Sequence, residues 1–153
     1  MSDQVPATVV LSLTVQDVAE SLSLYAKGLG AVELYRMGAP DGSIAQSEFM
    51  VGNSNIYISG TSAEWKAELL QEGQLAPCLF CLESDDPDAS HERAIAAGFT
   101  SIEEPKDQFW GVRTAIVQDS NGYRWNFRKQ VEELTLEEVS DRAKALFADC
   151  DVK

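Results

Sequence analysis

The first part of the chain alternates apolar and polar side chains and then changes to a helical period. Residues 7–15 have the period-two pattern of a β-strand, with Leu11 and Leu13 on one face. Asp17 then opens a segment whose apolar positions recur at helical spacing, and Gly30 ends it. Three short apolar runs separated by turn residues predict strands over residues 31–37, 43–51 and 55–59. The pattern therefore predicts a βαβββ unit.

A second series of the same order follows a connector. An apolar run over residues 77–82 predicts a strand, Asp85 marks the start of a helix, and Gly98 marks its end. Three further strands are expected over residues 99–103, 112–117 and 123–128. Between the last two lies Asp-Ser-Asn-Gly, residues 119–122, which predicts a tight turn. This series predicts a second βαβββ unit.

The two units superpose at a single offset of 68 residues. The shift places Asp17 on Asp85 and Gly30 on Gly98, so both helix starts and both helix ends coincide without a gap. Repeated supersecondary units indicate that one unit does not close a core alone. We therefore expect an α+β fold with two sheets side by side, helices on the outer face and an open cup on the other face.

The predicted organisation is one paired domain over residues 1–130 and a helical extension over residues 131–153. The two units span residues 7–60 and 76–129, and the connector spans residues 61–75, with a short helix expected around Trp65. In the extension, Thr135 followed by Glu138 predicts a helix that begins with a capping box. Its apolar stripe indicates that it packs against the domain or a partner subunit.

The composition limits the possible partners. The chain has 153 residues and a formal net charge of −13, with a pI near 4.3. Such a surface repels nucleic acid and anionic membranes, so we expect neither as a partner. It favours cationic ligands, although solubility alone also explains the charge. The beginning of the sequence lacks secretory signal features, and we expect a cytoplasmic protein.

The cysteine and histidine positions suggest structural roles. Cys78 and Cys81 have the spacing of a redox motif but lie in an apolar strand-like run, so we expect both to be small buried side chains. The one histidine, His91, is expected to be a solvated residue of the second helix. A single histidine also excludes a His-based metal cluster within one subunit.

The doubled βαβββ pattern, the Tyr25-x-x-Gly-Leu-Gly helix end and the Asp119-x-x-Gly-Tyr-x-Trp hairpin resemble the vicinal oxygen chelate superfamily, which includes glyoxalase I, extradiol dioxygenases and bleomycin-resistance proteins. The stretch from Asp107 to Arg113 and the helical extension resemble its PhnB-like branch. The resemblance covers about residues 8–148. It implies small-molecule chemistry or binding in a cup, and a homodimer whose pockets use both subunits.

The resemblance also implies where a divalent metal would bind. Enzymes of the family hold the metal with one side chain from the first strand and one from the last strand of each unit, usually His and Glu. At the 68-residue offset these positions hold Val10, Ile58, Cys78 and Asn126. Val10 and Ile58 offer no ligand atom, and Cys78 with Asn126 makes a poor site. We therefore expect no metal and no other cofactor.

Strand alternation selects the side chains expected to line the cup. They are Val10, Ser12, Ile58, Cys78, Phe80 and Asn126. Trp110 is expected either to stack on a ligand or to anchor its loop, whereas Trp125 is expected in the core. Arg113 is interpreted as a structural tie to Glu48 or Asp107. Glu48 is expected to be an exposed, solvated carboxylate; in the cup it would instead suit a cationic ligand or act as a general base.

The sequence therefore predicts a protein that binds or sequesters a small aromatic or cationic molecule without a metal, and that is not an enzyme. The alternative is a lyase, isomerase or dioxygenase of the same fold with a displaced metal site. A third possibility is an interaction or regulatory module. No catalytic residue is identified.

Overall fold

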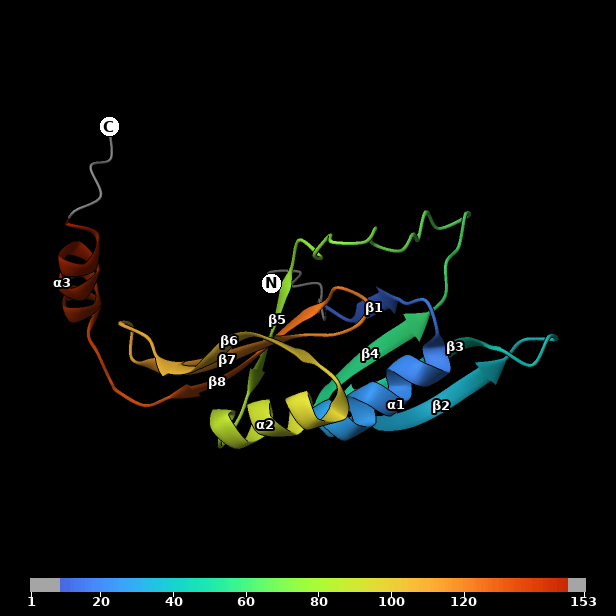
Figure 1. The fold of residues 1–153 in the computed structure, drawn as a ribbon, viewed down its shortest axis with the longest axis horizontal. Helices are drawn as coiled ribbons and strands as arrows, with labels where there is room; N and C mark the ends of the chain where they lie inside the picture. The colour runs from blue at the N-terminus through green and yellow to red at the C-terminus, as the bar shows by residue number, and fades with distance from the viewer. Residues whose placement is uncertain (1–8, 149–153) are drawn as a thin grey trace, which may run out of the picture. The chain divides into compact units, whose positions relative to one another are not determined.

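The computed structural model describes residues 9–148 and divides the chain into two compact units, one ending at Gln74 and one beginning at Leu75. Unit 1 contains β1 (Leu11–Thr14), α1 (Val18–Leu29), β2 (Val32–Gly38), β3 (Ile44–Val51) and β4 (Ser54–Ser59) (Figure 1). Unit 2 contains β5 (Leu79–Glu83), α2 (Pro87–Ala97), β6 (Thr100–Asp107), β7 (Val112–Gln118), β8 (Arg124–Gln130) and α3 (Leu136–Phe147). Both units have the predicted βαβββ order.

Each unit forms one four-stranded mixed sheet. The strand orders are β1-β4-β3-β2 and β5-β8-β7-β6, with the first pair parallel and the other two pairs antiparallel in each sheet. The predicted α+β fold with two βαβββ repeats is confirmed. Within the described residues, no helix is long and apolar enough to cross a membrane.

One face of each sheet is covered by the helix of the same unit. In unit 1, Phe49 contacts Tyr25 of α1 at a ring distance of 5.3 Å, and Ile58 is fully buried. In unit 2, Arg113 on β7 pairs with Asp88 of α2, and Trp125 is fully buried as predicted. We call these the helix faces and the opposite sides of the sheets the open faces.

The helix starts follow local signals, but the second begins one residue later than expected. Asp17 accepts a hydrogen bond from the backbone N–H of Glu20 at 2.9 Å, as predicted for the cap of α1. In unit 2 the capping side chain is Asp86, which accepts from the backbone N–H of Ala89 at 3.0 Å. The prediction of Asp85 is therefore wrong by one residue, and this shift changes the comparison of the two units.

Three local predictions are wrong. The connector has no helix around Trp65, which lies in a turn closed by a bridge between Ser62 and Ala67. His91 was expected to be solvated but is only 5% exposed; it packs against β6, where its Nε2 lies 2.8 Å from Ser101 Oγ. Cys78 and Cys81 are exposed rather than buried. Strand alternation puts Cys81 on the open face, while Cys78 precedes β5.

The C-terminal helix begins as predicted. Thr135 and Glu138 form the capping box, with the Glu138 carboxylate accepting from the Thr135 backbone N–H at 2.8 Å. Arg142 of α3 donates hydrogen bonds to both carboxylate oxygens of Glu132. Phe147 packs edge-on against Phe109, with ring centroids 6.0 Å apart. No side chain of α3 is buried within the described residues.

Candidate functional site

The open face of each sheet carries one row of side chains that crosses all four strands. Residues that are paired across neighbouring strands share a face, so the register identifies the members. In unit 1 the row is Tyr35, Glu48, Tyr57 and Ser12. In unit 2 the equivalent row is Glu103, Ile116, Asn126 and Cys81.

Asn126 is the most buried polar side chain of the unit 2 row. It is 8% exposed, and its Nδ2 lies 3.8 Å from Cys81 Sγ, a weak hydrogen-bond acceptor. Its Oδ1 is buried and has no hydrogen-bond partner within the described part of the chain. Exchanging the amide oxygen and nitrogen would leave the other atom unpartnered instead. A buried polar atom without a partner costs about 1–3 kcal/mol, so this carboxamide needs an explanation.

Polar and charged groups flank Asn126 on the same face. Arg124 and Arg128 lie two residues before and after it on β8, and each has a buried Nε without a hydrogen-bond partner. Arg128 Nε is 3.2 Å from Glu83, although the angle does not make a hydrogen bond. Arg124 instead donates from Nη2 to the backbone oxygens of Ala76 and Cys78 at 3.3 and 3.5 Å. The open face of unit 2 thus combines two guanidinium groups with a carboxamide oxygen that has no hydrogen-bond partner among residues 9–148.

The unit 1 row has a different chemistry. Glu48 lies between Tyr35 and Tyr57, one on each neighbouring strand, and accepts a hydrogen bond from Asn55 Nδ2 at 2.9 Å. A carboxylate between two aromatic rings attracts cations by charge and by the negative ring faces. Ser12, at the end of the row, is exposed.

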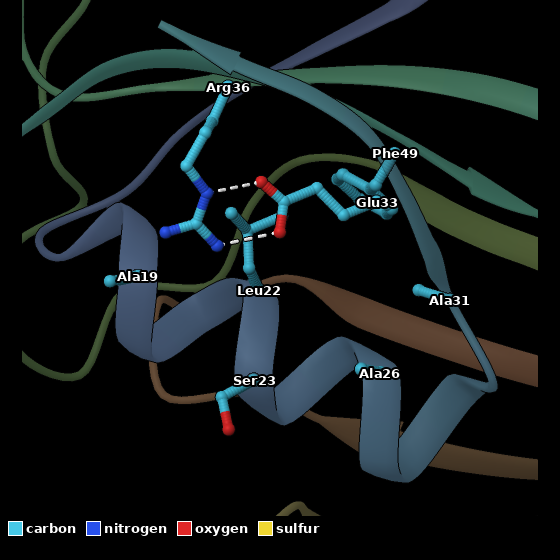
Figure 2. Close-up of a pocket in the computed structure, with 8 residues that line it drawn as sticks. All are labelled: Ala19, Leu22, Ser23, Ala26, Ala31, Glu33, Arg36 and Phe49. Atoms are coloured by element: carbon cyan, nitrogen blue, oxygen red, sulfur yellow. Dashed lines mark hydrogen bonds and ion pairs between the residues drawn. The ribbon is translucent and has the colours of Figure 1, made fainter. Parts of the chain in front are cut away.

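A hollow of about 180 Å³ lies on the helix face of unit 1, between α1 and the β2–β3 pair (Figure 2). Across it, Arg36 donates to both carboxylate oxygens of Glu33, from Nε at 2.5 Å and from Nη2 at 2.7 Å. This pairing keeps the pKa of Glu33 below its ordinary value. The remaining lining residues are Ala19, Leu22, Ser23, Ala26, Ala31 and Phe49. Because the two charged groups satisfy each other, the hollow presents no group that requires a ligand.

Two predicted lining residues lie on the helix face instead of the open face. Ile58 pairs with Ser47 and Leu13 and belongs to the core of unit 1. Phe80 pairs with Trp125, and their ring centroids are 4.8 Å apart. These two predictions of facing are wrong.

The other predicted residues are distributed over several places. Ser12, Glu48 and Asn126 lie on open faces, and strand alternation places Val10 with Ser12. Trp110 is 40% exposed and packs edge-on against Phe109, with ring centroids 4.9 Å apart. It lies just before the first paired residues of β7 and β8, Val112 and Gln130.

Arg113 is a structural tie on the helix face. Its Nε and Nη2 donate to Asp88 at 2.6 and 2.8 Å, and its Nη1 donates to Asp107 at 2.9 Å. The predicted pairing with Asp107 is confirmed, whereas the pairing with Asp88 was missed. These contacts raise the pKa of Arg113, mainly through Asp88, and the guanidinium lowers the pKa of Asp88. Sequence reasoning also missed Tyr57, Arg124 and Arg128, although their alternation on the last strand of each unit was a usable signal.

A family model described as the glyoxalase/bleomycin resistance protein/dioxygenase superfamily matches residues 7–127. The chain belongs to this superfamily. The chain is also similar to an uncharacterized protein of Mycobacterium bovis, with 28% identity over 130 residues that cover 83% of this chain and 86% of the relative.

Two solved structures share the fold of this chain. TioX from Micromonospora sp. ML1 is 21% identical, with a TM-score of 0.66 over 81% of this chain and 98% of its own. A glyoxalase/bleomycin resistance protein/dioxygenase from Nocardioides is also 21% identical, with a TM-score of 0.67 over 86% of this chain and 87% of its own. At these identities the comparison extends to the fold alone.

The register corrects which residues occupy the metal positions of the glyoxalase superfamily. The first-strand position lies seven residues before the aspartate that caps the helix. Because α2 is capped by Asp86, this position in unit 2 is Leu79 rather than Cys78. The counterpart of Asn126 in unit 1 is Tyr57 rather than Ile58. Both Tyr57 and Asn126 lie on the last strand of their unit between two residues that face the helix. The corrected set is Val10, Tyr57, Leu79 and Asn126.

This donor set does not fit a divalent metal. Val10 and Leu79 have no ligand atom, and an amide with a phenol lacks the imidazole, thiolate or carboxylate groups that bind Zn²⁺ and related ions. Among residues 9–148, no three His, Cys, Asp or Glu side chains come together as such a site would require.

Proposed function

We propose that this protein binds a small organic molecule on an open face of one of its sheets and does so without a metal ion. The proposal rests on the buried Oδ1 of Asn126, which has no hydrogen-bond partner among the described residues. A carboxamide has two N–H donors and one acceptor oxygen but no charge, so its free oxygen suits a ligand hydroxyl or amide N–H better than a cation such as Zn²⁺. Binding would return a hydrogen-bond partner to an atom that lacks one in the free protein.

The unit 1 row supports an aromatic or cationic character for the molecule that it contacts. Glu48 supplies a negative charge, and Tyr35 and Tyr57 supply ring faces on both sides of it. An ammonium or guanidinium group over such rings gains about 0.5–2 kcal/mol beyond the charge pairing. The net charge of −13 acts in the same direction. Sequestration is the mode of action that this chemistry supports.

The substitution Asn126→Leu tests the proposal by separating stability from binding. Leucine has a similar shape and removes both polar atoms, so the free energy of unfolding is expected to stay unchanged or to rise by up to about 1 kcal/mol. Ligand binding is expected to fall, because stabilising changes at functional sites commonly reduce function. A thermal-shift screen of small aromatic compounds on both proteins measures the two effects together.

The matched control is Ser12→Ala, which removes an exposed hydroxyl from the unit 1 row. It is expected to change neither stability nor the response to compounds that depend on Asn126. If Asn126→Leu destabilises the protein and keeps every ligand response, Asn126 is a structural residue and the proposal is wrong. The expected homodimer is a separate proposal, which light scattering of the purified protein tests.

A further inference from the structure

We propose that a ligand of the open face of unit 2 carries a negatively charged group, such as a carboxylate, and that Arg124 binds this group beside Asn126. This inference rests on the proposed function and specifies the chemistry of one of its sites. It differs from the cationic preference of the unit 1 row because it concerns different residues in a different unit.

Arg124 differs in its pairing from four other arginines of the described residues. Arg36, Arg113, Arg128 and Arg142 each contact a carboxylate within 4 Å. Arg124 makes no ion pair with any residue between 9 and 148, and its hydrogen bonds go only to two backbone oxygens at 3.3 and 3.5 Å. The chain has 25 acidic side chains and 12 basic ones. An arginine that pairs with no acidic side chain among residues 9–148 is therefore available to an acidic group of a ligand.

The position of Arg124 places its charge near the Asn126 carboxamide, whose oxygen is the atom without a partner. Arg124 and Asn126 are two residues apart on β8 and share a face, so their Cα atoms are about 7 Å apart. Leu79 pairs with Arg124, and Ile116 pairs with Asn126, which adds an apolar surface beside both polar groups. Leu79 is 38% exposed and Cys81 is exposed, so the edge of this cluster is open to solvent.

The ligand chemistry follows from this arrangement. A guanidinium group holds a carboxylate with two parallel N–H···O bonds, and Arg124 has a buried Nε without a partner. The apolar side chains favour a flat or aliphatic body, and Asn126 favours a hydroxyl or carbonyl attached to it. We therefore assign to this face a small organic acid with a polar substituent on an apolar body.

The overall negative charge does not cancel this preference. Charges separated by more than about 8 Å are largely screened at physiological ionic strength. The nearest acidic side chains on the same face are themselves neutralised, because Glu83 lies 3.2 Å from Arg128 and Glu103 lies 2.6 Å from Lys106. An anion in contact with Arg124 thus experiences mainly that guanidinium.

A charge series of small probes tests the inference. The intact protein is titrated with benzoate, benzamide and benzylamine at constant sodium chloride, and NMR follows the Asn126 side-chain amide and the Arg124 Nε–H signals. We expect a saturable shift of both signals with benzoate, a binding constant at least about tenfold weaker with benzamide, and no saturable shift with benzylamine.

Matched variants identify the arginine. Arg124→Gln keeps a hydrogen-bond donor but removes the charge, and it is expected to weaken benzoate binding about tenfold or more. Arg128→Gln removes the same charge from the same face, but its arginine already contacts Glu83, so the expected change is about twofold or less. Equal effects of the two variants would mean a diffuse response to charge and would overturn the assignment to Arg124.

The outcomes separate the two proposals. A saturable shift of Asn126 with benzamide or benzylamine but not with benzoate would refute the anionic group and leave small-molecule binding intact. If none of the three probes shifts the Asn126 signal, the proposed binding on this face fails as well. If the shift with benzoate vanishes when sodium chloride is raised moderately and Arg124→Gln has no effect, the binding is an adventitious ion contact only.

Discussion

Replacing Asp119 by alanine should destabilise unit 2 strongly, because this side chain holds the turn between β7 and β8. Asp119 is 4% exposed, and its Oδ1 accepts hydrogen bonds from the backbone N–H groups of Asn121 and Tyr123 at 2.9 and 3.0 Å. Its Oδ2 accepts from the indole Nε1–H of Trp125 at 3.0 Å. The turn that directs β8, and with it Asn126, depends on these three bonds.

The magnitude follows from what alanine leaves behind. The indole N–H of Trp125 is fully buried, and leaving it without an acceptor costs about 1–3 kcal/mol. The two backbone N–H groups lie in a half-buried turn that water reaches, so each lost bond costs about 1 kcal/mol. The expected loss is about 3–5 kcal/mol in the free energy of unfolding of unit 2.

Denaturant unfolding and hydrogen exchange of the Trp125 indole N–H measure this effect. Asp119→Asn, which keeps one acceptor oxygen, should be intermediate, and the indole proton should exchange fastest in Asp119→Ala. If Asp119→Ala lowers the free energy of unfolding by less than about 1 kcal/mol and leaves the indole exchange unchanged, the three Asp119 hydrogen bonds do not hold this turn.

Two further predictions concern the backbone near β7 and the main ion pair of unit 2. Gly111→Ala should lower the free energy of unfolding more than Gly42→Ala. Both glycines have a φ of 84°, but only at Gly111 would the added Cβ lie 2.6 Å from the backbone oxygen of Glu132. Equal losses of stability in denaturant unfolding would contradict this clash. Because Arg113 lowers the pKa of Asp88, its stabilisation is present above the ordinary carboxyl pKa and is lost as pH falls through the lowered value. Arg113→Gln should therefore return the Asp88 pKa towards its ordinary value in an NMR titration, and an unchanged pKa would refute the pairing.

The sequence predicted the order of elements because their signals are local. Asp17 as a cap, the capping box from Thr135 to Glu138 and the turn ending at Gly122 each involve residues within a few positions of one another. Such signals act before any tertiary contact forms, and the structure confirms them. The burial of Trp125 was also predictable, because its strand alternates clearly.

The facing of individual side chains was predicted less well, for a geometric reason. Side chains alternate along a strand, so a shift of one residue moves each one to the opposite face. Because α2 is capped by Asp86, the residues of β5 correspond to those of β1 at an offset of 69 and not 68 residues. The longer turn before β8 shifts the residues of β8 by one position relative to β4 in the same way. For this reason Phe80 and Ile58 were placed on the wrong face.

The burial of His91 and the exposure of the cysteines depend on the neighbouring strands. His91 lies opposite Ser101, which is ten residues away in sequence, and no local pattern indicates that contact. Cys81 belongs to an apolar run, but β5 is the outer strand of its sheet and Cys81 is on the open face. Packing decides these properties, and packing is not encoded in a short window of sequence.

The metal content of the purified protein distinguishes metal-independent binding from metal-dependent chemistry. The protein is prepared without chelators or nickel affinity resin, and elemental analysis is applied to it and to Asn126→Ala. We expect Zn, Ni, Mn and Fe far below one ion per chain in both proteins. About one divalent ion per chain, lost in Asn126→Ala, would contradict metal-independent binding and favour a lyase, isomerase or dioxygenase.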